Sequence, residues 1–222
     1  MGLLTGYISL ILLILLLAKY VTKRCHLTKI NAFLMKIHKY AAGGFLVVSI
    51  LHLILVLPVF DTRAVIVSVS GIVIIVVGIL LTISCHTIKN KKVEIKFHRL
   101  FSMIILLMLI THMVFYFIDF KNYLTAMDNI SVSEVDLNTI ENGEYIGEYD
   151  AGYIYAKVKI TIKDHTISNV ELLEHNHERG IKAEKALPDI IKNEQKIDVD
   201  TVSGATNSSR VIKQACMNAL VK

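Results

Sequence analysis

The sequence predicts a membrane bundle of four α-helices, all-α in class, followed by a small α+β domain outside the cytoplasm. Hydrophobic residues make up 54% of the 222 residues and the mean hydropathy is +0.55, which excludes a purely water-soluble protein. Residues 1–120 hold 12 basic and 3 acidic residues, whereas residues 121–222 hold 12 and 16. Because the basic excess lies beside apolar runs, it indicates a lipid membrane and not nucleic acid as partner.

Four apolar runs predict the membrane helices, at about residues 3–19, 34–60, 64–88 and 96–118. Each is close to the roughly 20 residues that a helix needs to cross a bilayer core. The first run could instead be a signal peptide, but it has no basic start and no Ala-x-Ala cleavage pattern, and Lys19 follows it directly. We therefore interpret it as a membrane anchor.

The loops between these runs predict the orientation. Six basic residues lie between residues 19 and 39 and five between residues 89 and 99, whereas the loop between runs two and three offers only Asp61 and Arg63. By the positive-inside rule the two basic loops are cytoplasmic. Both termini, and with them the C-terminal domain, are therefore expected outside the cytoplasm, in a multi-pass protein of the cell membrane.

The second and fourth runs each carry two histidines at the same spacing, His38 with His52 and His98 with His112. Fourteen positions place both histidines of a helix on one face and about 21 Å apart. Because the two helices run in the same direction, His38 comes level with His98, and His52 with His112. Bis-histidine ligation of two stacked b-type haems needs this arrangement. Polar bonding inside the bundle is the alternative, although ionisable side chains within a bilayer are costly and usually functional.

The paired histidines resemble the dihaem core of ferric reductase and NADPH oxidase transmembrane domains, and of other bacterial membrane cytochromes b, over about residues 20–120. The resemblance implies that these four histidines are axial ligands of two haem irons. The larger reductases have six helices where this chain has four. His26 and His86 are not part of the pattern; they suit a haem propionate, a quinone headgroup or a donor protein, or an interface without a role.

After the fourth run the pattern changes. Residues 121–140 are polar and without clear periodicity, and we interpret them as a linker. The small α+β domain is expected from residue 141 onward, with extended segments at 143–149 and 153–163. Apolar residues alternate along the second segment, and a turn then leads into 166–174, which predicts a hairpin.

Two helices complete the predicted domain, one beginning at Pro188 and one over residues 207–221. Between them, residues 200–206 read Asp-Thr-Val-Ser-Gly-Ala-Thr. A tight turn of small residues before a helix suits an anion, because Gly204 permits close backbone approach and Thr206 adds a hydroxyl. Serine and threonine at this place are also ordinary helix caps. The residues alone leave both interpretations open.

Residues 142–222 resemble the FMN-binding domain shared by bacterial extracytoplasmic flavoproteins and by subunits of the Rnf and sodium-pumping NADH:quinone reductase complexes. The resemblance rests on three segments: the Gly-x-Tyr-x-Gly start at Gly143, Tyr145 and Gly147, the segment Glu174-His175-Asn176-His177-Glu178, and residues 200–206.

That resemblance implies a covalent flavin. In the family a flavin transferase attaches FMN through a phosphoester to the motif's threonine hydroxyl, the surrounding motif residues shape the attachment loop or are recognised by the transferase, and the histidine segment lies near the flavin. A solvated polar stretch, or a His-x-His metal pair, is the alternative for the two histidines. The residues assigned to FMN in this way are Thr206, Asp200, Ser203, Gly204, Ala205, His175 and His177.

Joined, the two parts predict a transmembrane oxidoreductase or electron-transfer component of the flavocytochrome b type. A quinol or a cytoplasmic reductase would donate electrons, which pass through two b haems to FMN and then to an external acceptor that the chain does not identify. No Gly-x-Gly-x-x-Gly, Walker sequence or cysteine cluster occurs, so nucleotide oxidation and iron–sulfur chemistry are expected elsewhere. Two alternatives are a flavin carrier on a haem-free membrane anchor and a redox sensor.

Overall fold

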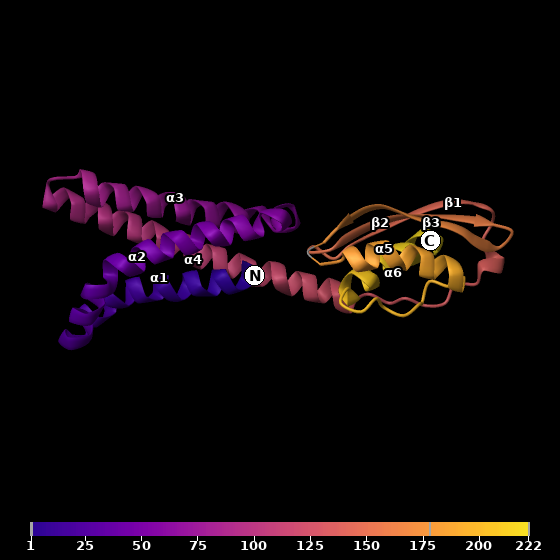
Figure 1. Cartoon of the computed structure of the whole chain (residues 1–222), viewed down its shortest axis with the longest axis horizontal. Helices are drawn as coiled ribbons and strands as arrows, with labels where there is room; N and C mark the ends of the chain where they lie inside the picture. The colour runs from indigo at the N-terminus through magenta and orange to yellow at the C-terminus, as the bar shows by residue number, and fades with distance from the viewer. Residues whose placement is uncertain (1, 178, 222) are drawn as a thin grey trace. The chain divides into compact units, whose positions relative to one another are not determined.

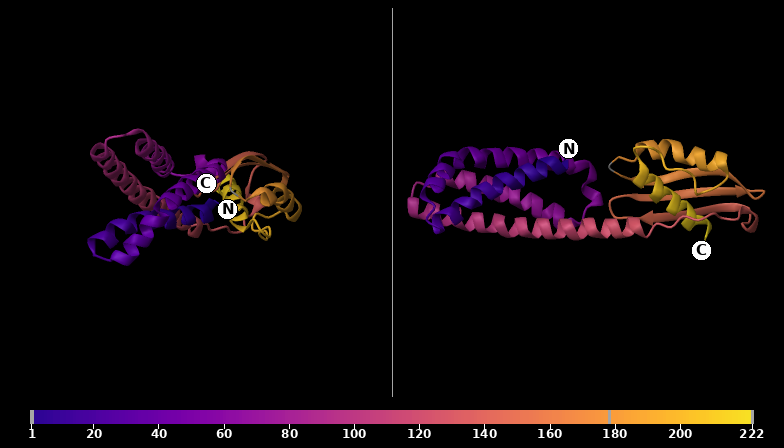
Figure 2. Two further views of the ribbon diagram at one scale, coloured as in Figure 1. Left: turned by 60° about the vertical axis from the view of Figure 1, so that its left-hand side comes forward. Right: turned by 90° about the horizontal axis from the view of Figure 1, so that it is seen from below.

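The computed structural model describes residues 2–177 and 179–221, and its chain forms two compact units (Figures 1 and 2). The first unit consists of Met1–Phe60 and Val65–Phe115. The second consists of Asp61–Ala64 and Tyr116–Lys222, so it includes the last turns of the fourth helix.

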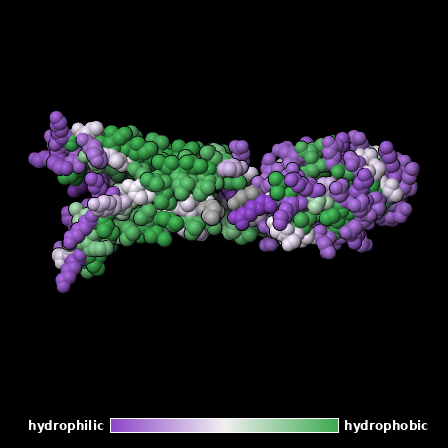
Figure 3. Space-filling view, in the orientation of Figure 1, coloured by the Kyte–Doolittle hydropathy of each residue, from purple (hydrophilic) through white to green (hydrophobic). Residues whose placement is uncertain are grey.

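Four long helices account for the first unit: α1 (Gly2–Arg24), α2 (Thr28–Val56), α3 (Val65–Thr87) and α4 (Lys91–Asp128), with a short 3-10 helix, η1 (Leu57–Thr62), after α2. All four are long and apolar enough to cross a membrane. Apolar side chains cover the visible face of these helices (Figure 3). So large an apolar surface is costly in water and suits lipid.

The interior of the first unit is small. Leu13, Phe45, Ile74 and Ile105 form its buried cluster, with one residue from each helix. Phe45 and Ile105 lie midway between the two histidines of α2 and α4, respectively, so this cluster occupies the level between the inner and outer histidine pairs.

The fourth helix is longer than the sequence predicts. It continues beyond residue 118 to Asp128, and the expected linker 121–140 is therefore helical in its first part. Met127 and Ile140 are buried in the core of the second unit. Other apolar residues from this segment pack against the same core, which explains why it is not a free tether despite its polar composition: Tyr123, Ala126, Ile130, Val132, Val135 and Leu137.

The second unit contains a three-stranded antiparallel sheet in the order β1 (Gly143–Asp150), β2 (Tyr155–Lys163) and β3 (Thr166–Asn176). The predicted hairpin is confirmed. Asp164 and His165 both have positive φ, 49° and 59°, as a two-residue turn between twisted strands requires.

Two helices, α5 (Ile181–Glu194) and α6 (Thr206–Leu220), pack against the sheet. The alternating apolar residues of β2 are fully buried, so the predicted α+β class is confirmed. The prediction that Pro188 begins a helix is wrong, because Pro188 lies inside α5. A proline there removes one backbone hydrogen bond. The buried stripe of Ala183, Leu187 and Ile191 still holds the helix in place.

Gly147 shows how closely α6 approaches the sheet. A Cβ atom at this position would collide with the Ala215 carbonyl oxygen and with the backbone of Ala219. We therefore expect Gly147→Ala to lower the free energy of unfolding of the second unit by about 3 kcal/mol, because backbone atoms cannot move aside as side chains do.

The matched control is Gly143→Ala in the same strand, where the added Cβ would meet only Tyr145 at an ordinary 3.6 Å. Urea unfolding of the detergent-solubilised chain, followed by amide exchange in the sheet, measures the difference. Equal stabilities of the two variants would contradict the close approach.

Candidate functional site

Residues 202–206 form a tight turn that leads into α6. The Val202 carbonyl accepts a hydrogen bond from the Ala205 N–H (2.9 Å), and Gly204 between them has φ +79°. This is the geometry of a type II turn, whose third residue favours glycine. Thr206 follows as the first residue of α6 and its side chain is exposed.

The capping interpretation of this motif is not supported. The N-cap of α6 is Ala205, which has no side-chain hydrogen-bonding group, and no side-chain cap is formed. The serine and threonine hydroxyls of the motif therefore do not serve as the cap. The first N–H groups of α6 and the positive end of its dipole lie beside the exposed Thr206 hydroxyl.

Two buried side chains of α6 hold the loop that precedes this helix through hydrogen bonds. Ser209 accepts a hydrogen bond from the Val202 N–H and donates one to the Ala205 carbonyl, both at 3.0 Å. Lys213 donates to Asp198 Oδ1 (2.8 Å) and to the Val199 carbonyl (2.7 Å). These hydrogen bonds connect the loop to α6 and pair its buried polar groups.

A positively charged side chain lies beside the turn. Lys182, at the start of α5, brings its Nζ to within 3.7 Å of where a Cβ on Gly204 would lie. Asp200 and Ser203 are exposed on the same loop, whereas Ala205 is buried. An exposed hydroxyl next to a cation and a helix N-terminus is a suitable place for a phosphate group.

His175 and His177, at and just beyond the end of β3, form a cluster with Glu184 of α5, which we call the His175 cluster. The Glu184 Oε2 lies 3.4 Å from His175 Nδ1 and 3.3 Å from His177 Nε2. The Gly180 N–H donates to His177 Nδ1 (2.8 Å), so a neutral His177 carries its proton on Nε2, facing the carboxylate.

These atoms are near enough to one another to surround a metal ion, all within 4.8 Å. The proton that Gly180 imposes on His177 Nε2 would have to leave first, and metal-bound histidines normally donate from their second nitrogen. The hydrogen bonds therefore favour a cluster organised around the Glu184 carboxylate over a metal centre.

Gly180 lies where the His175 cluster meets α6, the helix that begins at Thr206. A Cβ at this position would collide with Ser208 Oγ of α6 and lie 2.7 Å from His175 Cε1. Ser208 is two residues after Thr206, so the His175 cluster adjoins the first turn of α6. Glu178, the last residue of the resembling segment, lies outside the described residues.

Comparison with protein families identifies this region. The family model of the FMN-binding domain matches residues 152–221, which include β2, β3, both helices and the Thr206 turn. The C-terminal unit therefore contains an FMN-binding domain. Comparisons with curated proteins and with solved structures find no match.

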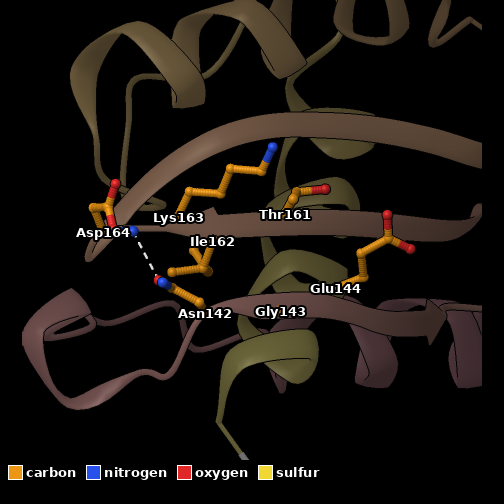
Figure 4. A pocket seen from close by; sticks show the side chains of 7 residues that line it. All are labelled: Asn142, Gly143, Glu144, Thr161, Ile162, Lys163 and Asp164. Carbon is orange, nitrogen blue, oxygen red and sulfur yellow. Dashed lines mark hydrogen bonds between the residues drawn. The ribbon is translucent and has the colours of Figure 1, made fainter.

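A hollow at the edge of the sheet in the FMN-binding domain is separate from the Thr206 turn. It measures about 470 Å³ and is lined by residues 142–144 and 161–164, with the Asp164 N–H donating to Asn142 Oδ1 at 2.7 Å (Figure 4). None of the residues assigned to FMN lines it. It is an open depression between β1 and the β2–β3 turn.

His175 makes the stability of the FMN-binding domain pH-dependent. Burial, followed by the adjacent His177, lowers the pKa of His175 from 6.5 to about 4. Between those values the unfolded chain binds the extra proton and the folded domain does not, so stability is full above pH 6.5 and falls as the pH decreases toward 4. We expect a loss of about 3 kcal/mol across this window.

Urea unfolding of the full chain at pH 7 and pH 4 measures this loss. His175→Gln should remove most of the pH dependence, whereas His165→Gln, which changes an exposed histidine of the β2–β3 turn, should retain it. A His175 imidazole that titrates near pH 6.5 in NMR spectra would contradict the assignment.

In the first unit, the inner histidines lie side by side. The His38 and His98 rings have centres 6.2 Å apart and planes inclined by 55°. His98 Nδ1 also lies 3.7 Å from the Cys85 thiol of α3. This neighbourhood agrees with the level predicted from the histidine spacing.

The outer histidine of α2 is oriented by the start of α1. His52 Nδ1 lies 2.9 Å from the Gly2 carbonyl and 3.3 Å from Thr5 Oγ1. A carbonyl only accepts, so Nδ1 carries the proton and Nε2 keeps the lone pair. Gly6 lies against the ring, where a Cβ would come within 3.0 Å of Cε1.

The outer histidine of α4 has the same surroundings on α3. His112 Nδ1 lies 3.0 Å from the Val67 carbonyl and 3.3 Å from Ser70 Oγ, and a Cβ on Gly71 would come within 3.2 Å of the ring. Val67, Ser70 and Gly71 have the spacing of Gly2, Thr5 and Gly6. The hairpins α1–α2 and α3–α4 therefore orient their outer histidines in the same way.

Sequence reasoning did not identify the residues that support these sites. Glu184, Gly180 and Lys182 carry no motif, and the carbonyls of Gly2 and Val67 are backbone atoms that a sequence does not distinguish. Lys213 could have been recognised, because a lysine within the apolar stripe of a predicted helix indicates a buried ion pair. His86, for which the sequence left several roles open, forms a hydrogen bond within its own helix, from Nδ1 to the Thr82 carbonyl at 2.8 Å.

Proposed function

We propose that this protein carries electrons across a membrane through two b haems to FMN that is bound covalently to Thr206. The FMN-binding domain implies flavin-based electron transfer. The observation that carries the transmembrane route is the matched geometry of the two histidine pairs in α2 and α4.

The inner pair fits one iron. Two imidazoles that bind a metal from opposite sides through bonds of about 2.0–2.1 Å have ring centres about 6 Å apart. The His38 and His98 rings are separated by 6.2 Å.

The outer histidines, His52 and His112, are oriented in a way that suits the same ligation. In both His52 and His112 the hydrogen bond at Nδ1 leaves the lone pair on Nε2, which is the nitrogen that would bind iron. Histidine ligands normally have such a second-nitrogen partner, which fixes the ring and raises its basicity. When bound, haem supplies reversible one-electron storage at each level.

The Thr206 turn fits an FMN phosphate. The exposed hydroxyl lies beside the uncapped start of α6 and near the Lys182 ammonium, both of which stabilise negative charge. A flavin transferase outside the cytoplasm would form the phosphoester, with Asp200, Ser203, Gly204 and Ala205 as its recognition loop. His175 and His177 border the same turn and would contact the bound flavin.

The charge distribution supports the side of the membrane on which each part of the route would lie. The basic loops α1–α2 and α3–α4 would face the cytoplasm, which leaves the FMN-binding domain outside. Polar residues gather at the end of the helices that carries these two loops, at the left of Figure 3. A quinol or a cytoplasmic reductase would donate at the inner pair, and an external acceptor would take electrons from FMN.

Optical spectroscopy of the purified full chain tests the proposal. We expect reduced b-type bands with two haems per chain, and in proteoliposomes a quinol should reduce haem before flavin. Protein without a Soret band would support the haem-free flavin carrier instead. Haem that is reduced while the flavin stays oxidised in the absence of any external acceptor would contradict electron transfer to FMN.

A further inference from the structure

The last turns of α4 carry a row of stacked aromatic rings that reaches the FMN-binding domain. We propose that this aromatic ladder, Tyr116, Phe120, Tyr123 and Tyr153, is the path along which single electrons pass from the haem on His52 and His112 to the flavin on Thr206. The inference rests on the proposed function and adds to it the residues that connect its two parts.

Three rungs share one face of α4. Tyr116, Phe120 and Tyr123 have the spacing i, i+4 and i+7, and Tyr116 follows His112 by one helical turn. The Tyr116 and Phe120 rings are parallel within 5°, with centres 6.3 Å apart, and Tyr123 lies another 6.3 Å from Phe120. All these separations are within the range of direct aromatic contact.

The fourth rung belongs to the FMN-binding domain. Tyr153, just before β2, stacks on Tyr123 with ring centres 4.8 Å apart and also contacts Phe120 at 6.4 Å. At the same place Asn207 Nδ2 donates to the Tyr123 hydroxyl at 2.8 Å. Because Asn207 is adjacent to Thr206, a hydrogen bond joins the ladder directly to the residue next to the flavin attachment.

An aromatic belt at a membrane surface would not produce this arrangement. Belt residues point their rings toward headgroups. Here the rings face one another, and they lie within one compact unit together with the FMN-binding domain. Electron tunnelling decays most steeply through gaps that are empty or filled with water. Contacts between the rings remove such gaps from the ladder.

The surroundings of Tyr153 disfavour oxidation of its ring. Burial raises the pKa of Tyr153 to about 12, so the phenol stays neutral. The Arg63 guanidinium lies 3.4 Å from the ring centre and disfavours a positive charge on the ring. With both groups bound, one electron would pass from ferrous haem iron, leaving it ferric, to FMN, and water would supply any proton that the flavin takes up.

Flash reduction of haem in the full-length protein in proteoliposomes tests the ladder through the rate at which the flavin band bleaches. Tyr123→Leu should slow this step about tenfold or more. Tyr123→Phe keeps the ring and loses only the Asn207 bond, and it should stay within a few-fold of wild type. Phe115→Leu, which removes an exposed ring from the same helix, should leave the rate unchanged.

A second readout does not depend on turnover. A phenol near an excited flavin quenches its fluorescence by electron donation, so Tyr123→Leu and Tyr123→Phe should both lengthen the flavin lifetime, and Phe115→Leu should not. Unchanged bleaching rates in Tyr123→Leu, with both haems and covalent flavin present, would overturn the ladder and leave the proposed function intact. Wild-type protein without haem would overturn both.

Discussion

Thr206→Val should abolish protein-bound flavin. Valine keeps the β-branched shape of threonine and lacks only the hydroxyl that would form the phosphoester. The side chain is exposed at the first position of α6, so the fold of the FMN-binding domain should be unchanged. In a denaturing gel the band of the wild-type chain should fluoresce under ultraviolet light, and the band of the variant should be dark.

Thr201→Val is the matched control, because Thr201 is an exposed threonine of the same loop. It should retain wild-type fluorescence, and both variants should retain two haems per chain. Fluorescence that persists in Thr206→Val would exclude this hydroxyl as the attachment point. Loss in both variants would point to a general effect on recognition of the loop.

His52→Ala should reduce the haem content from two per chain to one. The outer iron would lose one axial ligand and its oriented Nε2 donor, whereas the inner pair His38 and His98 lies on the other side of the Phe45 and Ile105 cluster. Haem per chain, measured by reduced-minus-oxidised spectra after extraction, gives the number directly. Flavin reduction by a membrane-side donor should stop.

His86→Ala provides the control for this variant. His86 bonds the Thr82 carbonyl of its own helix and faces no partner histidine among the described contacts, so its loss should leave two haems and normal flavin reduction. Two haems per chain in His52→Ala would exclude His52 as a ligand. Loss of both haems would mean that the two levels are not independent.

The four apolar helices were predictable because their signals are local. Apolar runs and the fourteen-residue histidine spacing follow from helix periodicity, which does not depend on what the helix contacts. The segment 121–140 was misinterpreted for the same reason. Its polar composition hides single apolar residues such as Met127 and Ile140, and these are buried only because the domain core lies beside them.

The Thr206 motif was equally visible in the sequence, but its supports were not. Ser209 looks like an ordinary residue of a terminal helix, and the sequence does not show which groups Lys213 contacts. Both act on the loop because α6 packs against residues 198–205. Gly147 was noticed as part of a motif, and the structure adds its physical reason: the backbone of α6 occupies the space of a side chain.

The sequence by itself determined which elements exist, in which order, and which chemistry they carry: apolar helices, two pairs of histidines, and a small-residue turn ending in Thr206. Only the tertiary structure decided which groups meet, such as His52 with the Gly2 carbonyl, Glu184 with both His175 and His177, and Asn207 with Tyr123. Periodicity is a property of neighbouring residues along the chain. Contacts between residues far apart in the chain depend on how whole elements pack, and no local pattern specifies that.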